Sequence, residues 1–137
     1  MIEVFLDTSY AISLAVASDQ LHPRALALAQ QLRNDKTRLI VTRAVMLEIG
    51  NSLSKTRYRN AAIALLNALE VDPLVEIIEL NLEDYQAAFG LFQQRSDKEW
   101  GLVDCISFVV MRQRGLYEAL TADGHFVQAG FRALLLE

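Results

Sequence analysis

The sequence predicts an α/β fold in which helices cover a parallel sheet. Short apolar runs rich in strand-forming residues alternate along the chain with segments whose apolar residues recur every three or four positions. Strands that alternate with helices form a parallel, doubly wound sheet. Two of the apolar runs end in an aspartate. We expect these acids at the carboxyl edge of the sheet, which is where ligands bind in this class of fold.

Each strand and helix follows from a short stretch of this pattern. Short apolar runs predict strands, and amphipathic segments bounded by polar, glycine or proline residues predict helices. In chain order, the expected strands cover residues 2–6, 38–42, 75–80, 120–123 and 131–136. The expected helices cover residues 10–15, 22–34, 43–53, 58–69, 82–92 and 102–114.

Capping residues mark several of the helix ends. Ser9, Thr42 and Asn81 each precede an amphipathic segment, and we expect their side chains to accept hydrogen bonds from the first amide groups of the helix. Gly115 follows the most apolar helix and is expected to end it.

The pattern also predicts which helix faces are buried. Residues 102–111 are apolar on almost every side, which is typical of a buried helix. The helix over 82–92 has one apolar face that we expect to point inward, formed by Leu82, Tyr85, Phe89 and Phe92. The helix that carries Glu48 and the helix over 58–69 hold more apolar residues than one core requires, which predicts either a partner surface or simply a larger core.

Length and composition limit the possible classes of protein. A chain of 137 residues predicts one domain over residues 1–137. The net charge of −4 argues against a broad basic surface for duplex DNA. Cys105 is the single cysteine, so no internal disulfide forms. The sequence predicts no signal peptide and no apolar segment long enough for a membrane helix. We therefore expect a cytoplasmic location.

Four carboxylates from distant parts of the chain are expected at one edge of the sheet. Asp7 and Asp123 end two strands, while Glu48 and Asp104 lie in the early turns of two helices that start from the same edge. Asp104 and Ser107 are the strongly polar side chains within residues 102–111, and their spacing places them on one helix face. An unpaired buried carboxylate is costly, which points to a partner for Asp104.

Each acid taken alone also has a structural interpretation. Asp7 could cap the first helix, Glu48 and Asp104 could be first-turn acids favoured by the helix dipole, and Asp123 could be a turn residue. Taken together, the four acids favour a metal-binding site. Two carboxylates at about 5 Å repel each other by roughly 3 kcal/mol at an effective dielectric near 20, so four of them need a cation. Oxygen ligands suit Mg²⁺ or Mn²⁺.

The neighbours of these acids resemble a known family. The matching stretches are Asp7-Thr8-Ser9 after an apolar strand, Thr42-x-x-Val45-x-x-Glu48, Trp100-Gly101-Leu102-Val103-Asp104-Cys105-Ile106-Ser107, and Thr121-Ala122-Asp123-x-His125-Phe126. They resemble the PIN-domain ribonucleases, and among them the VapC-type toxins of prokaryotic toxin–antitoxin pairs. The resemblance extends over essentially the whole chain.

This resemblance implies a fold, an activity and partners. It implies an α/β/α sandwich with a central parallel sheet, a Mg²⁺- or Mn²⁺-dependent endoribonuclease, and a VapB-like antitoxin that covers the site. Together with the surplus apolar surface it also implies a homodimer. The metal-binding and catalytic acids would be Asp7, Glu48, Asp104 and Asp123, and the supporting hydroxyls would be Thr8 and Ser107.

Two further groups of residues have open roles. His125 follows a turn glycine, where a histidine contacts the phosphate of a substrate or is simply solvated. Basic residues near helix starts either contact RNA phosphates or are ordinary surface charges, namely Arg43, Lys55, Arg57, Arg59, Arg95 and Lys98.

The sequence argues against two other classes of α/β protein. A haloacid-dehalogenase-like phosphatase requires a second aspartate at the position of Ser9, and a response-regulator receiver requires an acidic pair after the first strand. The sequence meets neither requirement. The remaining alternative is a non-catalytic PIN-like protein-interaction module whose acids are structural.

Overall fold

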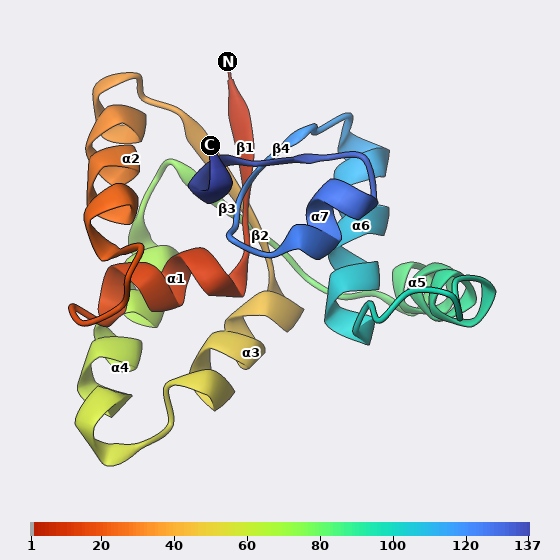
Figure 1. The fold of residues 1–137 in the computed structure, drawn as a ribbon, viewed down its shortest axis with the longest axis horizontal. Helices are drawn as coiled ribbons and strands as arrows, with labels where there is room; N and C mark the ends of the chain where they lie inside the picture. Colours follow the sequence, from red (N-terminus) through yellow and green to blue (C-terminus); the bar gives the residue numbers. More distant parts are fainter. Residues whose placement is uncertain (1) are drawn as a thin grey trace.

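The computed structural model, which describes residues 2–137, contains one five-stranded parallel sheet with the order β3-β2-β1-β4-β5 (Figure 1). The strands are β1 (Glu3–Leu6), β2 (Arg38–Thr42), β3 (Val75–Ile78), β4 (Glu118–Leu120) and β5 (Arg132–Ala133). The helices are α1 (Thr8–Ala15), α2 (His22–Asn34), α3 (Arg43–Ser52), α4 (Thr56–Val71), α5 (Leu82–Gln94), α6 (Leu102–Arg114) and α7 (Gly124–Gln128), followed by a 3-10 turn η1 (Leu134–Leu136).

The helices form two layers around the sheet. α1, α2 and α4 lie on one side, α5, α6 and α7 lie on the other, and α3 lies below the carboxyl ends of the strands, where it packs against α1, α4 and α6 (Figure 1). β1 lies at the centre of the sheet, between β2 and β4. The predicted α/β sandwich with a central parallel sheet is confirmed.

Local capping signals were reliable at three helix ends. The Thr42 hydroxyl accepts a hydrogen bond from the Val45 amide at 3.1 Å, and the Asn81 side chain accepts one from the Asp84 amide at 2.7 Å. Gly115 ends α6 in the left-handed conformation, with φ of 68°, which a residue with a side chain adopts only at a cost. α6 itself is buried, as its apolar sequence predicted.

The prediction that Ser9 caps the first helix is wrong. α1 begins at Thr8, and Asp7 is its N-cap residue. The Ser9 hydroxyl instead donates to the Asp7 carboxylate and accepts a hydrogen bond from the Ala122 amide, because β4 ends beside β1. The residue therefore connects two strand ends instead of capping a helix.

The two predicted C-terminal strands are shorter than expected. β4 ends at Leu120, and the backbone then leaves the sheet so that Asp123 can cap α7 by accepting from the His125 amide at 2.9 Å. β5 contains two residues and continues as η1, although its sequence is apolar throughout.

The prediction that the aromatic face of α5 points inward is also wrong. The exposed fractions are 70% for Leu82, 38% for Tyr85, 41% for Phe89 and 44% for Phe92. α5 packs against α6 through a different stripe, in which Ala88 is fully buried and Leu91 is partly buried. The close approach at Ala88 turns the larger side chains outward, where Phe89 stacks with Tyr85 and with Phe92.

An aromatic cluster fixes α7 against α6. The Phe108 ring meets Trp100 and Phe126 edge-on, with centroid distances of 5.0 Å in both pairs, and all three side chains are buried. Edge-to-face geometry of this kind is favourable beyond the area it buries. Since Phe126 follows His125 in α7, this packing sets where α7 lies relative to Asp104 on α6.

Among residues 2–137, the structure contains no helix with the length and apolar character that crossing a membrane requires.

Candidate active site

Asp7 occupies the centre of the site at the end of β1. Its side chain is 4% exposed, and its amide continues the β1–β4 pairing by donating to the Leu120 carbonyl at 3.1 Å. The Thr121 hydroxyl donates to Asp7 Oδ2 at 2.7 Å, and the Ser9 hydroxyl donates to the same oxygen at 3.1 Å. The strand pairing and the two hydroxyls fix this carboxylate in one orientation.

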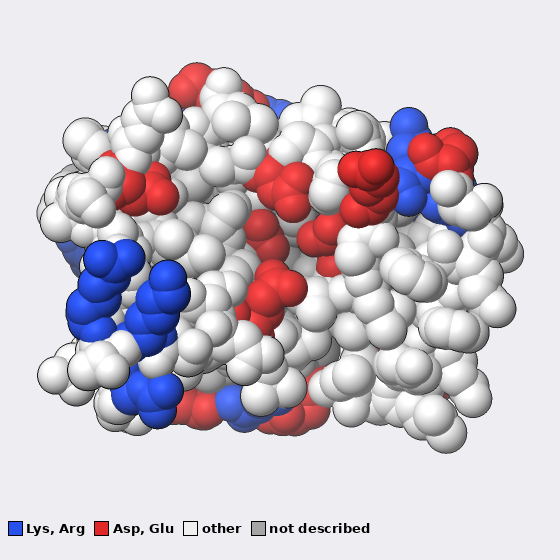
Figure 2. Space-filling model, turned by 60° about the horizontal axis from the view of Figure 1, so that its bottom comes forward, with Lys and Arg blue, Asp and Glu red and all other residues white. Residues whose placement is uncertain are grey.

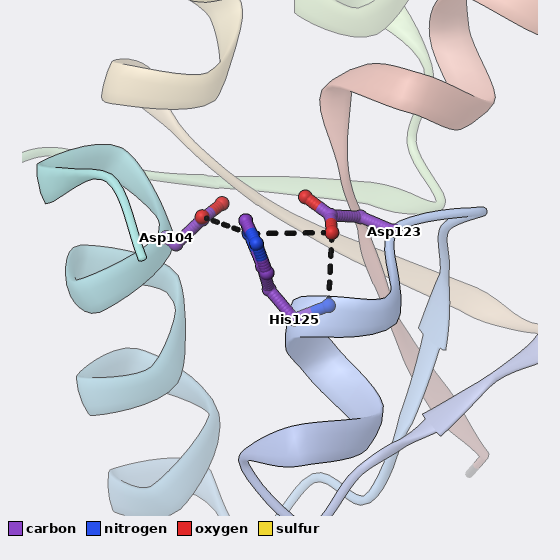
Figure 3. A group of neighbouring side chains, drawn as sticks. All are labelled: Asp104, Asp123 and His125. Carbon is purple, nitrogen blue, oxygen red and sulfur yellow. Dashed lines mark hydrogen bonds and ion pairs between the residues drawn. The ribbon is translucent and has the colours of Figure 1, made fainter. Parts of the chain in front are cut away.

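Asp104, Asp123 and His125 form a cluster beside Asp7 (Figure 3). The His125 Nδ1 atom lies 3.1 Å from Asp104 Oδ2 and 3.3 Å from Asp123 Oδ1, so the ring links the start of α6 to the start of α7. The Gly101 amide donates to Asp104 Oδ2 at 3.1 Å. One ligand atom from each of the three side chains lies within 4.8 Å of the others, which is close enough for a shared metal ion.

Glu48 reaches the site from α3. Its Oε1 atom accepts a hydrogen bond from the Thr8 hydroxyl at 2.6 Å, and Thr8 follows Asp7 directly. α3 begins at the carboxyl end of β2, which neighbours β1, so the fold brings this helix to the same edge. The structure therefore brings all four sequence-predicted acids to one edge of the sheet.

Acidic side chains gather on one face of the molecule. Figure 2 shows acidic side chains gathered near the middle of the face that lies at the bottom of Figure 1. Among residues 2–137, no lysine or arginine forms an ion pair with Asp7, Glu48, Asp104 or Asp123. Within the described residues, these four acids therefore have no lysine or arginine in contact with them.

Burial and mutual repulsion shift the protonation of two of these acids. Burial raises the pKa of Asp7 to about 6, and the negative charge of Asp104 adds to this shift, while the Thr121, Thr8 and Ser9 donors oppose it. The pKa of Asp104 is raised chiefly by burial and further by Asp123, against the hydrogen bonds from Gly101 and His125. Both carboxylates are therefore in an environment that disfavours their ionised form and would favour a bound cation.

Ser107 forms no hydrogen bond with the four acids among the described residues. Its hydroxyl is fully buried and donates to the Val103 carbonyl one turn earlier in α6, at 3.0 Å. Any support that it gives to Asp104 acts through the backbone of that turn.

Sequence reasoning missed three residues of this site. The sequence allows two roles for His125, and the structure shows its ring in contact with two of the acids. Ser9 and Thr121 were not assigned to the site, although both hydroxyls bind Asp7. Their spacing in the sequence could have identified them, because Ser9 lies two residues after Asp7 and Thr121 lies two residues before Asp123.

Comparisons with known proteins agree with this geometry. The PIN domain family model matches residues 4–132. The 23S rRNA-specific endonuclease VapC20 of Mycobacterium tuberculosis is 27% identical over 128 residues, which cover 93% of this chain and 95% of the relative.

Two solved structures show the same architecture. The crystal structure of Mycobacterium tuberculosis VapC20, described as a sarcin–ricin loop cleaving toxin, superposes with a TM-score of 0.83 at 27% identity and covers 94% of this chain and 96% of the other. FitAcB from Neisseria gonorrhoeae matches with a TM-score of 0.65 at 19% identity over 95% and 94% of the two chains, which shows a shared fold. The family model spans most of the chain, and the chain belongs to the PIN-domain family.

Proposed function

We propose that this chain is a metal-dependent endoribonuclease and the toxin of a toxin–antitoxin pair, with residues 1–137 acting as one nuclease domain. The observation that carries this proposal is the convergence of four acids at one sheet edge, without a lysine or arginine partner among residues 2–137. The similarity to VapC20, a 23S rRNA-specific endonuclease, supports the substrate class.

The donor set fits Mg²⁺ or Mn²⁺. Asp7, Glu48, Asp104 and Asp123 would hold the ion through carboxylate oxygens, which hard divalent cations prefer. The bound ion would lower the pKa of a coordinated water and stabilise charge on the attacked phosphate. The chain positions the ligands: Thr8 orients Glu48, the Thr121 and Ser9 hydroxyls orient Asp7, and His125 orients Asp104.

Metal removal tests this function. The purified chain is expected to cleave RNA when Mg²⁺ or Mn²⁺ is present and to lose that activity in excess EDTA, because four carboxylates at one edge need a cation. Cleavage should be followed on labelled RNA by gel electrophoresis, and readdition of the metal should restore it. Full activity in EDTA would contradict a metal-dependent mechanism. A chain that cleaves no RNA but binds an antitoxin would favour the non-catalytic interaction module.

The partners that we propose are an RNA substrate, a small VapB-like antitoxin and a second copy of this chain. The homodimer is supported by the exposed aromatic face of α5, formed by Leu82, Tyr85, Phe89 and Phe92. An uncharged stripe along one helix is self-complementary, so a two-fold axis can bury it against its own copy.

The Phe89→Glu variant is expected to be monomeric. It places a charge in the middle of the stripe, and burying that charge in a dimer would be costly. Light scattering of the purified chain measures the change, with Gln94→Glu as the control of equal charge, since Gln94 is an exposed polar residue of α5 that lies away from the stripe. A monomeric parent, or a Phe89→Glu variant that remains dimeric, would show that this face is not the dimer interface.

A further inference from the structure

Three basic side chains form an exposed corner where α3 turns into α4. We call Lys55, Arg57 and Arg59 the basic corner, and all three are exposed. Five other arginines form ion pairs with acids, namely Arg38, Arg43, Arg95, Arg114 and Arg132. Within the part of the chain that the structure describes, the basic corner forms no such pair, so its three positive charges are not neutralised.

Neutral groups hold the two arginines of the corner in place. The Arg57 guanidinium lies over the Tyr58 ring, 4.7 Å from its centroid. Arg59 donates from Nε and Nη2 to the Ser54 carbonyl at 3.0 Å and 2.7 Å. Both side chains are therefore oriented without an anion, and each keeps free donors for a phosphate.

The stability of α4 does not explain why three basic residues lie at its start. Lys55 is the N-cap residue of α4 and makes no capping hydrogen bond with its side chain, and Arg57 and Arg59 follow in the first helical turns. The amino end of a helix carries partial positive charge, which favours acids and disfavours cations. α5 follows this rule with Glu83 and Asp84 in its first turn, whereas α4 has no acid there.

The basic corner lies on the same face as the acidic site. Figure 2 shows basic side chains gathered over the end of the molecule where α3 meets α4, beside the central acids. Glu48 and Ser54 are separated by about six residues along α3 and its turn, roughly 10 Å at the helical rise. A few nucleotides of a flexible single strand are therefore enough to connect the basic corner with the acids.

The geometry points to a phosphate-binding subsite for the RNA strand at Lys55, Arg57 and Arg59, a few nucleotides from the phosphate that is cleaved. This inference rests on the proposed endoribonuclease function. The subsite supplies local attraction for phosphates beside an active site that is itself negative, in a chain whose net charge is −4. A flexible strand held at the corner would present a nearby phosphate to the acids.

The test compares two triple variants in an Asp7→Asn background, in which RNA remains intact. The first replaces the corner with Lys55→Gln, Arg57→Gln and Arg59→Gln. The control removes the same charges elsewhere, with Arg24→Gln, Arg33→Gln and Lys36→Gln on and beside α2, where Arg24 also donates to a backbone carbonyl. Fluorescence anisotropy with a labelled single-stranded RNA, measured over a range of salt concentrations, gives Kd and its salt dependence.

We expect the corner variant to bind RNA about tenfold or more weakly at low salt. The slope of log Kd against log salt should fall by about 2, since each lost phosphate contact on a single strand contributes roughly 0.7. The control should change neither quantity by a comparable amount. In the active background, the corner variant should raise KM more than it lowers kcat. Its melting temperature should equal or exceed that of the parent, which excludes misfolding as the cause.

Other results would overturn the inference. If the corner and control variants lose the same amount of RNA affinity, the binding reflects general electrostatic attraction and not a subsite. Unchanged RNA binding combined with loss of antitoxin binding would assign the corner to the protein partner. The Kd measurement does not require cleavage, so it tests the subsite independently of the nuclease activity. If the parent protein cleaves no RNA but its RNA binding still depends on the basic corner, the proposed function fails while this inference stands.

Discussion

The Asp7→Asn variant is expected to lose RNA cleavage by at least about 100-fold, because loss of an outer-shell partner alone costs roughly 10–100-fold and Asp7 is a proposed ligand. In EDTA at neutral pH, the same variant should be more stable than the parent. Its amide preserves the shape of the side chain and can keep the hydrogen bonds with Thr121 and Ser9, while it removes a buried charge.

The shifted pKa of Asp7 determines how the stability of the metal-free protein changes with pH. The pKa of Asp7 is about 6 in the folded state against an ordinary value of 3.8, so the folded state binds more protons between these values. Metal-free stability therefore falls as the pH rises from about 4 to 6 and stays lower above it. Two pKa units correspond to about 3 kcal/mol, taken as an order of magnitude.

Thermal melts in EDTA across this pH range measure the difference between parent and variant. The difference should vanish near pH 4 and grow toward pH 7. Added Mg²⁺ should raise the melting temperature of the parent above pH 6, since a ligand that binds only the folded state stabilises it, and should raise that of the variant much less. A variant that melts well below the parent at pH 7 would show that Asp7 stabilises the fold, and its role as a metal ligand would be rejected.

The Phe108→Ala variant is expected to destabilise the protein by about 3–5 kcal/mol, the usual range for a buried phenylalanine. The ring is fully buried and meets Trp100 and Phe126 edge-on. Removing it leaves a cavity between α6 and α7, the two helices whose starts carry Asp104 and His125. Activity should therefore fall even at temperatures where the variant remains folded.

Urea denaturation in EDTA measures this change. Phe108→Leu serves as the graded control, because it leaves a smaller cavity and should cost less than Phe108→Ala. If Phe108→Ala costs less than about 1 kcal/mol, or leaves cleavage unchanged in the folded protein, then the aromatic cluster does not position the site.

Local signals in the sequence were sufficient for much of the fold. Thr42 and Asn81 were predicted as caps because a cap and its helix are adjacent in the chain. The position of Asp7 followed from an apolar run with an acid at its end. The shared edge of the four acids followed from the rule that parallel strands end on one side.

The errors arose where a partner is distant in the sequence. Serine is a common capping residue, but Ser9 accepts its hydrogen bond from the Ala122 amide, which lies 113 residues away. The apolar pattern of α5 contains both the stripe with Ala88 and the stripe with Phe89, and only the closeness of α6 selects the first. His125 follows a glycine in the sequence, and the cap formed by Asp123 turns it back toward Asp104.

The hydrogen bond from Thr121 to Asp7 joins positions 114 residues apart, and β4 pairs directly with β1. The first strand to be synthesised therefore receives β2 early but receives its second neighbour, β4, only after residues 118–120 have been made. Until then Asp7 lacks both Thr121 and the acid at position 123. A nascent chain that lacks residues 121–123 would thus hold an incomplete acidic site, even though its first strand has already been made.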